Sequence, residues 1–376
     1  MVCTAGIALL GCGTVGASVA ERLLHERDAI ERRSGVRYEL RAIAVRDASK
    51  PRPGSIDPRL FTNDARALVN DPHVDLVIEC IGGTTQAADL IENALERGRS
   101  VVTANKDLLA TQGPRLQSLA AARGARLRYE AAACGAIPVV RMLDDALAGD
   151  RIDALAGVVN GTCNAILSAM ENGAEFAEAL ADAQAQGYAE ADPSNDVEGI
   201  DAAHKLAVLM QLAFGLAVIS PRVRHSGIAA VTKRDVARAQ MLGYRIRLVA
   251  AAARTPAGAF AGVAPVLVPQ DHPFAAISGP ENIVRVVARD AGPLIMRGRG
   301  AGGPATASAV LGDVVSSLRA LGERHDIART ARALEPALDV APIFADLPRH
   351  PELPRYTLWD NTFLDAPVSH VNRALS

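Results

Sequence analysis

Lys205 and Asp201 are the first residues in this sequence whose types and spacing could hold and move a proton. Lys205 is one of only four lysines among the 40 basic residues of the chain, and all the others are arginines. Arginine keeps its proton at physiological pH, whereas lysine can release a proton and take it back. The scarcity of lysine therefore makes Lys205 a candidate acid/base residue.

Asp201 and Lys205 stand four residues apart, which places both side chains on one face of a helix. On an exposed helix this pair would be an ordinary ion pair worth a few tenths of a kcal/mol. The helix continues through residues 206–212, which are apolar on almost every side, so the pattern predicts a buried helix. A buried carboxylate and ammonium need each other, or a ligand, to offset their desolvation.

Three more carboxylates precede this helix, at Glu190, Asp192 and Asp196. Four carboxylates and a lysine could form a metal site, but the nearest histidine, His204, points away from Asp201. A site for a zwitterionic amino acid fits better, with carboxylates holding its ammonium and the lysine facing an oxygen. The residues thus indicate an amino-acid substrate, with Glu190, Asp196 and Asp201 as its candidate ligands.

A glycine-rich turn near the N-terminus has the spacing of a dinucleotide-binding fingerprint. It follows a predicted strand over residues 7–10 and opens a predicted helix. In such a turn the first glycine makes the bend, and the second lets backbone amides approach a pyrophosphate. The third glycine allows the helix to pack closely against the strand. The candidate cofactor residues are Gly11, Gly13, Thr14, Val15 and Gly16.

The end of the second predicted strand, which covers residues 40–45, bears on the choice of cofactor. A carboxylate there typically binds the ribose of NAD, whereas cations accommodate the 2′-phosphate of NADP. Arg46 and Lys50 favour NADP, while Asp47 leaves NAD possible. An ordinary solvated turn is the structural alternative.

Two further strand ends carry candidate residues, because ligands in open α/β sheets bind at the carboxyl edge of the strands. Gly82 follows one predicted strand, and Thr103 ends the next, shortly before Lys106. We expect these residues to border the cofactor and the substrate. A solvated lysine at a helix start is the alternative for Lys106.

The chain is expected to be α/β, with a Rossmann-like doubly wound parallel sheet and an α+β substrate-binding and dimerisation domain. Short apolar runs alternate with amphipathic stretches up to a boundary near Pro138, and a single helix is predicted over residues 15–33. We predict a nucleotide-binding domain at 1–137, a catalytic and dimerisation domain at 138–300, and a returning helix at 301–334, with no element assigned to 335–376.

Composition argues against several classes of function. A net charge of −2 gives no field that would attract nucleic acid or anionic lipid. The five cysteines are scattered without metal-ligand spacing, which indicates a reducing compartment. With no apolar run long enough to span a bilayer and no basic leader, we expect a cytoplasmic protein.

Together these segments resemble homoserine dehydrogenase. The resemblance covers residues 5–325, and it is most specific in the segment 187–205. It also rests on Asn105-Lys106, on residues 130–138, on Asn160-Gly161-Thr162-Cys163-Asn164 and on residues 300–308. The resemblance implies reversible oxidation of L-homoserine to L-aspartate 4-semialdehyde with NADP or NAD, in threonine, methionine and isoleucine biosynthesis.

The resemblance also implies roles for individual residues. Lys205 matches the acid/base lysine of the family, and Glu190 and Asp201 match residues that bind homoserine. Gly187 and Gly302 match positions near the cofactor, and Lys106 matches a lysine that lines the cofactor and substrate cleft.

The resemblance implies a monovalent cation, usually sodium in the family, at the backbone carbonyls of Glu130, Ala133, Gly135 and Ile137. The family also implies a homodimer. Many bacterial members carry a C-terminal threonine-binding domain, for which the chain after the last motif is too short. We therefore expect no feedback regulation through such a domain.

Three alternatives remain open. A semialdehyde dehydrogenase of the acylating kind would need a nucleophilic cysteine, and only Cys134 and Cys163 lie near the substrate motifs. A non-catalytic sensor of NADP would need none of Glu190, Asp201 and Lys205. A further alternative is another NAD(P)-dependent amino-acid dehydrogenase.

Overall fold

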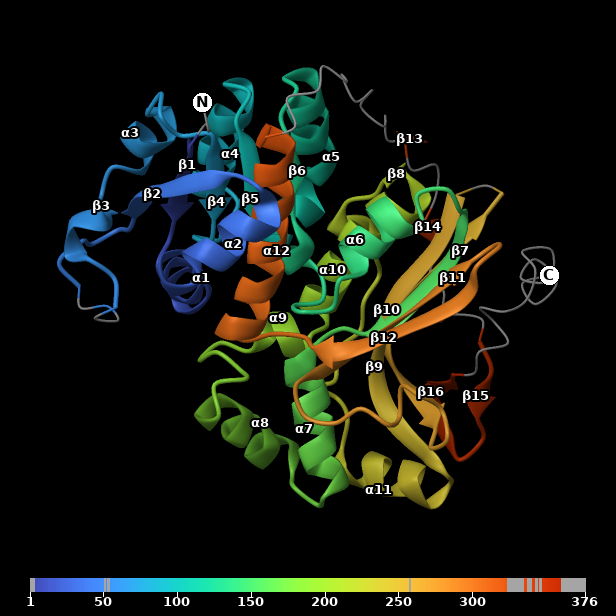
Figure 1. Ribbon diagram of the computed structural model, residues 1–376. Helices are drawn as coiled ribbons and strands as arrows, with labels where there is room; N and C mark the ends of the chain where they lie inside the picture. Colours follow the sequence, from blue (N-terminus) through green and yellow to red (C-terminus); the bar gives the residue numbers. More distant parts are fainter. Residues whose placement is uncertain are drawn as a thin grey trace. The chain divides into compact units, whose positions relative to one another are not determined.

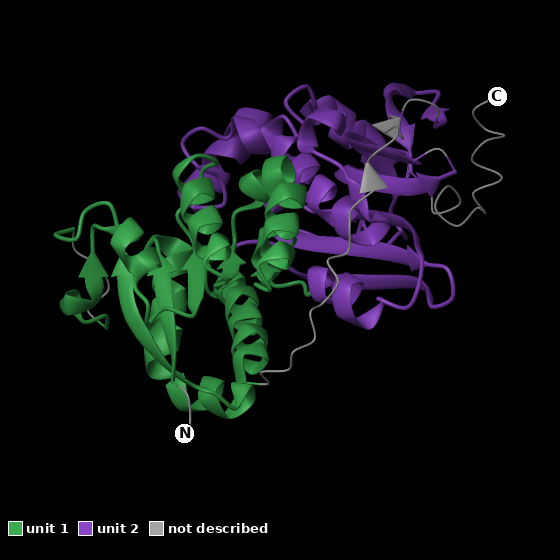
Figure 2. Ribbon diagram, turned by 90° about the horizontal axis from the view of Figure 1, so that it is seen from above, with its two compact units in different colours: residues 1–138, 302–334 green, residues 139–301, 335–376 purple. Residues whose placement is uncertain are grey.

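The structure is a computed structural model that describes residues 4–50, 52, 55–256, 258–322, 335–336, 340–341, 344 and 347–359. The chain forms two compact units (Figure 2). Unit 1 comprises residues 1–138 and 302–334, and unit 2 comprises residues 139–301 and 335–376. The chain therefore leaves unit 1 after its nucleotide motifs and returns to it at the glycines before the last long helix.

Unit 1 is built on a parallel six-stranded sheet with the order β3-β2-β1-β4-β5-β6 (Figure 1). Its strands are β1 (Thr4–Leu10), β2 (Arg37–Ala44), β3 (Phe61–Thr62), β4 (Leu76–Glu79), β5 (Ser100–Thr103) and β6 (Leu127–Arg128). The strand order reverses direction at β1, which is the switch point where doubly wound sheets bind their ligands. The predicted Rossmann-like fold class is confirmed.

Helices cover both faces of this sheet. Alternate residues of β1 point to opposite faces, so Ile7 and Leu9 join one core cluster while Ala8 and Leu10 join the other. The first cluster is completed by α1 (Thr14–His25), α2 (Arg27–Ser34) and α12 (Gly303–Gly322). The second is completed by α3 (Ala65–Asn70), α4 (Gln86–Glu96) and α5 (Lys106–Ala122).

The prediction of one helix over residues 15–33 is wrong. The structure has two helices, because Glu26 leaves helical geometry with φ −104° and ψ 21°. The guanidinium of Arg22 donates to the Glu26 carboxylate at 2.9 Å at this break. Ile30 of the second helix still enters the same core cluster as Val19, which explains why the apolar spacing suggested a single helix.

Unit 2 is built on a mixed eight-stranded sheet with the order β12-β11-β7-β9-β10-β16-β15, in which β14 also pairs with β10. Its long strands are β7 (Ile152–Val158), β9 (Tyr244–Thr255), β10 (Gly258–Pro269), β11 (Glu281–Ala288) and β12 (Gly292–Arg299). The shorter ones are β14 (Val340–Ala341), β15 (Arg349–His350) and β16 (Leu353–Leu358). Neighbours from β12 to β10 run antiparallel, so this sheet differs in kind from that of unit 1.

The helices of unit 2 include the one that carries Asp201 and Lys205. They are α6 (Val139–Arg141), α7 (Gly161–Glu171), α8 (Phe176–Ala185), α9 (Ser194–Val197), α10 (Ile200–Phe214) and α11 (Lys233–Met241). A small sheet joins β8 (Leu216–Ala217) to β13 (Glu335–Pro336). Most residues of α10 are buried, as its apolar sequence predicts. Within the described residues, no helix combines the length and apolarity needed to cross a membrane.

Several strands of unit 2 were not predicted, and β12 and β16 are the longest of them. β12 is an edge strand paired only with β11, and its alternating half-exposed residues, with Ile295 46% exposed, give no apolar run. β16 lies in the segment to which the sequence analysis assigned no element. It pairs with β10 and leads into Trp359, which is buried in the core of this sheet.

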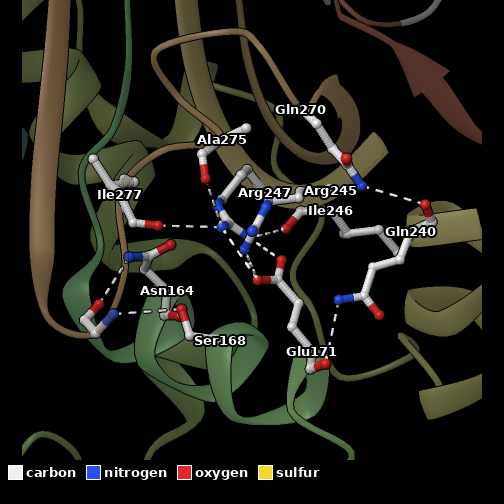
Figure 3. A network of polar contacts seen from close by, with 11 residues as sticks. Asn164, Ser168, Glu171, Gln240, Arg245, Ile246, Arg247, Gln270, Ala275 and Ile277 are labelled. Carbon is white, nitrogen blue, oxygen red and sulfur yellow. Dashed lines mark hydrogen bonds and ion pairs between the residues drawn. The ribbon is translucent and has the colours of Figure 1, made fainter. Parts of the chain in front are cut away.

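A buried ion pair ties the C-terminal end of α7 to β9 (Figure 3). Arg247 is fully buried, and it donates to the Glu171 carboxylate at 2.5 Å and to the carbonyls of Ala275 and Ile277 at 3.2 Å. Arg245 binds the other carboxylate oxygen of Glu171. The network fixes where α7 ends, and its first residues contribute to the candidate site described below.

We expect substitution of either partner to destabilise unit 2 strongly, because the remaining charge would stay buried without compensation. Glu171→Gln or Arg247→Met should each lower the free energy of unfolding by about 3–5 kcal/mol in denaturant titrations. Arg297→Ala is the matched control, since its pair with Glu281 is partly exposed and should be worth about 1 kcal/mol or less. An equal, small effect in all three variants would contradict the structural importance of the network.

Candidate active site

The glycine turn of unit 1 has the geometry of a phosphate-binding loop. Gly11 has φ +94°, and a Cβ there would lie 2.6 Å from the Cys80 carbonyl oxygen. A Cβ at Gly16 would lie 2.2 Å from the Gly11 carbonyl oxygen, whereas a Cβ at Gly13 would meet nothing within 4 Å. Only the second glycine therefore faces open space, in front of the helix that begins at Thr14. An anion can approach the amides of that helix start.

The start of α1 packs against the start of α12. A Cβ at Gly303 would lie 2.9 Å from both the Thr14 carbonyl oxygen and the Ser18 hydroxyl. Gly302, just before it, has φ +109° and open space around its α-carbon. Val15 packs against the adjoining core cluster. The glycine turn and Gly302 are far apart in the sequence, and both are predicted to lie near the cofactor. The packing of α1 against α12 brings them close together within unit 1.

The turn after β2 exposes two of the predicted cations, Arg46 and Lys50. Asp47 is engaged within the turn, where its carboxylate accepts from the Ser49 hydroxyl at 2.6 Å and the Ser49 amide at 2.9 Å. These bonds, led by the hydroxyl, lower the pKa of Asp47. Arg52, which was not predicted, donates to the Asp47 carbonyl at 2.7 Å and adds a third cation to this turn.

A buried carboxylate that was not predicted, Glu79, organises the end of β4. It is fully buried and accepts from the amides of Ile81 at 2.8 Å and Gly82 at 2.9 Å. Its other oxygen accepts from the Thr103 hydroxyl at the end of β5. Glu79 therefore links the ends of β4 and β5, the two strand ends that were predicted to border the cofactor and the substrate. Its signal in the sequence is a carboxylate at the end of an otherwise apolar strand.

Asn105 continues this link to the helix that begins at Lys106. Its side-chain oxygen accepts from the Leu108 amide at 3.1 Å and caps α5, while its Nδ2 donates to the Gly83 carbonyl at 2.7 Å. Its own amide donates to the Thr103 hydroxyl at 3.0 Å. Lys106 is the first residue of α5 and is half-buried, so it lies at the carboxyl edge of the sheet.

The segment predicted to bind a cation, residues 130–137, lies against α12 within unit 1. The Glu130 amide donates to the buried carboxylate of Asp313 at 2.7 Å, which fixes the start of this segment. The Glu130 carbonyl accepts from the Ala133 amide at 3.4 Å, which is a long hydrogen bond. Gly135 has φ +60°, and Ile137 is buried. Among the described residues, no cluster of three or more acidic, histidine or cysteine side chains forms a metal site.

In unit 2, Lys205 is held between a carboxylate and a backbone carbonyl. Its Nζ donates to Asp201 Oδ2 at 2.7 Å and to the Val159 carbonyl at 2.8 Å. The exposed fractions of the Lys205 and Asp201 side chains are 11% and 8%, so the pair is shielded from water. Asn282 Nδ2 donates to the same Val159 carbonyl at 3.0 Å and orients it. The lysine ammonium therefore has one fixed direction.

Asn160 was quoted within a motif but given no role, and the structure places it in this cluster. Its Nδ2 donates to Asp201 Oδ2 at 2.8 Å and to Asp196 Oδ1 at 2.7 Å. Its Oδ1 accepts from the Cys163 amide at 2.7 Å and caps α7. One amide thus joins Asp196 and Asp201, which come from different helices.

Asp196 is the perturbed acid of the cluster. Burial, followed by the negative charge of Asp201, raises the pKa of its carboxyl group, and the hydrogen bond from Asn160 and the charge of Lys205 oppose the rise. Perturbed acids of this kind are typical of functional sites. Asp196, Asp201 and Lys205 are therefore brought together as the sequence suggested.

Glu190 is not brought into this cluster. Its side chain is exposed, and its carboxylate has no hydrogen bond or ion pair with another described residue. Its loop is tethered instead through backbone carbonyls, by Gln184 Nε2 to Glu190 at 3.0 Å and by the Thr162 hydroxyl to Tyr188 at 2.7 Å. Gly187, which begins the loop, has φ +74°.

The two candidate nucleophilic cysteines are buried in the structure. Cys163 donates its thiol to the Asp196 carbonyl at 3.1 Å. Burial, and then the charges of Asp196 and Asp201, raise the pKa of this thiol well above its ordinary value. A thiol that resists ionisation is a poor nucleophile, which argues against the acylating alternative.

Two family models match the chain. The model described as homoserine dehydrogenase, NAD binding domain matches residues 11–130, and the model described as homoserine dehydrogenase matches residues 138–315. The matched ranges include the glycine turn of unit 1 and the lysine cluster of unit 2.

Relatives and solved structures agree with these matches. A homoserine dehydrogenase of Corynebacterium glutamicum is 46% identical over 320 residues, covering 84% of this chain and 72% of that protein. The crystal structure of a homoserine dehydrogenase from Thiobacillus denitrificans has a TM-score of 0.86 at 38% identity, covering 91% and 80% of the two chains. A hyperthermophilic archaeal homoserine dehydrogenase in complex with NADPH has a TM-score of 0.71 at 26% identity, covering 84% and 98%.

These matches and the nucleotide-binding sheet define an NAD(P)-dependent oxidoreductase that acts on a CH–OH group. The chain belongs to the homoserine dehydrogenase family.

The glycine geometry predicts different outcomes for two neighbouring substitutions. Gly13→Ala adds a Cβ into open space, so thermal unfolding should be unchanged while NADPH affinity, measured by fluorescence titration, falls about tenfold or more. Gly16→Ala forces overpacking against Gly11 and should cost about 1–3 kcal/mol of stability. Wild-type NADPH affinity in Gly13→Ala would show that this turn does not approach the pyrophosphate.

Proposed function

We propose that Lys205 is the acid/base residue of this homoserine dehydrogenase. The observation that carries the proposal is its buried position, with Asp201 and the Val159 carbonyl holding its ammonium. In the reductive direction, Lys205 donates a proton to the developing alkoxide of aspartate 4-semialdehyde, and its charge stabilises that oxygen. In the oxidative direction it takes the proton from the hydroxyl of L-homoserine.

The carboxylates divide into two roles under this proposal. Asp201 accepts from both Lys205 and Asn160, so it positions the lysine, and we also assign it to the substrate site. Glu190 presents an exposed carboxylate, and we assign it to the ammonium group of homoserine. We assign Asp196 to the substrate as well, and Lys106 of unit 1 to the substrate or the cofactor.

Unit 1 binds the cofactor, which supplies and accepts the hydride when bound. We assign Gly11, Gly13, Thr14, Val15 and Gly16 to its pyrophosphate, and we assign Gly82, Thr103, Gly187 and Gly302 to cofactor binding as well. Three cations in the turn after β2 favour the 2′-phosphate of NADP, because Asp47 is already bonded to Ser49. The archaeal relative solved with NADPH supports this choice. NAD remains the alternative cofactor.

A monovalent cation, sodium, is proposed at the carbonyl oxygens of Glu130, Ala133, Gly135 and Ile137. Two observations support this proposal: Asp313 fixes the start of the segment by accepting from the Glu130 amide, and Gly135 has φ +60°. The cation would hold this segment in place and takes no part in proton transfer. The protein is further proposed to be a cytoplasmic homodimer that serves threonine, methionine and isoleucine biosynthesis.

Lys205→Ala should reduce turnover of L-homoserine with NADP by about 100-fold to 10,000-fold, because it removes the group proposed to accept the proton. NADPH affinity should stay nearly unchanged. Lys205→Arg should also be inactive, since arginine keeps its charge but does not release its proton. Steady-state absorbance assays and fluorescence titration measure the two quantities.

Lys233→Ala is the control, because Lys233 is a partly exposed lysine of unit 2 whose pair with Glu175 is 3.6 Å long. Wild-type turnover is expected for it. Full activity of Lys205→Ala would refute the proposed role, and a large loss of NADPH binding would make Lys205 a cofactor residue instead.

Arg46→Ala tests the choice of cofactor. The apparent KM for NADP should rise about tenfold, with little change for NAD, because only NADP carries the phosphate that the guanidinium would bind. Arg59→Ala is the control, as its side chain is 91% exposed and pairs with Asp57. Equal effects on both cofactors would show that Arg46 does not bind the 2′-phosphate.

A further inference from the structure

Asn160 makes a contact that no other described side chain of the cluster makes: its Nδ2 spans two carboxylates. Asp201 Oδ2 lies 2.8 Å and Asp196 Oδ1 lies 2.7 Å from this nitrogen. Asn160 is 2% exposed, so water does not replace these bonds. The same Asp201 oxygen accepts from Lys205 at 2.7 Å. The asparagine amide and the lysine ammonium therefore share one acceptor atom.

Two carboxylates that lie around one nitrogen repel each other, and such a pair tends to keep one proton. An amide nitrogen carries two N–H groups, one for each carboxylate, and it adds no charge. A serine hydroxyl in its place has one O–H and could serve only one carboxylate, and an aspartate has none when ionised. The geometry thus uses a property that is specific to the amide.

We propose that Asn160 is a positioning residue for the reaction: by donating to Asp196 and Asp201 together, it holds the Asp201 carboxylate against Lys205. The proposal rests on the role of Lys205 proposed above. It assigns Asn160 no contact with substrate or cofactor. Its effect reaches the reacting atoms only through Asp201 and the lysine ammonium.

The groups that surround Asn160 define what its loss should change. Asp196 comes from α9, Asp201 and Lys205 come from α10, and Cys163 and Thr162 come from the start of α7. The pKa of the Asp196 carboxyl is already raised by burial and by Asp201, and the bond from Asn160 opposes this rise. Without that bond the carboxyl should take up its proton at a still higher pH.

Asn160 also has a purely structural role, because its Oδ1 caps α7 by accepting from the Cys163 amide. The two roles belong to different atoms of one side chain, so they can be separated by substitution. Asn160→Ser and Asn160→Asp both keep an oxygen suited to the cap and lose the amide donor. Asn160→Asp in addition places a third carboxyl group between the other two.

The experiment compares pH profiles of kcat and of kcat/KM for homoserine in the full-length wild-type enzyme, Asn160→Ser and Asn160→Asp. Thermal unfolding and NADPH titration are measured on the same preparations. Thr232→Ala is the control for losing a cap, because Thr232 caps α11 in the same unit and takes no part in the cluster. It should lower the unfolding midpoint and leave the pH profile unchanged.

For Asn160→Ser we expect kcat near neutral pH to fall about tenfold and the acidic limb of the profile to move upward by about one pH unit. Once protonated, Asp196 can donate its own O–H to Asp201 and draw that acceptor away from Lys205, so activity is lost at a higher pH than in the wild type. Asn160→Asp should shift the limb further, although its cap is intact. NADPH affinity should be unchanged in both variants.

Wild-type acidic limbs in both variants would overturn the proposal and leave Asn160 as a helix cap alone. A loss of kcat that follows only the loss of stability, as in Thr232→Ala, would overturn it as well. Failure of the proposed acid/base role is seen separately, as retained turnover in Lys205→Ala. The two ideas therefore fail in different variants.

Discussion

The buried ion pair between Lys205 and Asp201 is the constraint on which the rest of unit 2 depends. Removing two charges from water costs several kcal/mol for each ion, and the pair is stable only if its geometry and its other hydrogen bonds are good. The structure meets this condition with the Val159 carbonyl on one side and Asn160 on the other. A lysine held in this way has the fixed position and the shielding from water that the proposed proton transfer requires.

The elements around the pair can be understood as supports for it. α10 is apolar nearly all round and brings Asp201 and Lys205 into the interior, while the end of β7 brings Val159 and the start of α7 brings Asn160. The other end of α7 is fixed by the fully buried Arg247 through Glu171 (Figure 3). The buried ion pair at the end of α7 therefore helps to hold Asn160 at its start, and through Asp201 it helps to hold Lys205 in place.

Local patterns predicted much of this molecule. The alternation of short apolar runs with amphipathic stretches, and the spacing of the glycines, predicted the parallel sheet. The apolar residues around Asp201 and Lys205 predicted that their helix, α10, is buried. The helix break at Glu26 was missed because its apolar residues still share one core, and β12 was missed because an edge strand needs no apolar run. Contacts between distant residues were not predictable from one sequence: Asn160 meets Asp196 over 36 positions, and Glu79 meets Thr103 over 24.

Nuclear magnetic resonance of the lysine ε-carbons tests the central claim most directly, because the four lysines of the chain give four signals. The ε-carbon shift reports on the charge and surroundings of its ammonium group. We predict that one signal, assigned by its absence in Lys205→Ala, stands apart from the others and moves when Asp201 is replaced by asparagine. The other three should not move. A Lys205 signal that coincides with those of exposed lysines and ignores this substitution would contradict the account.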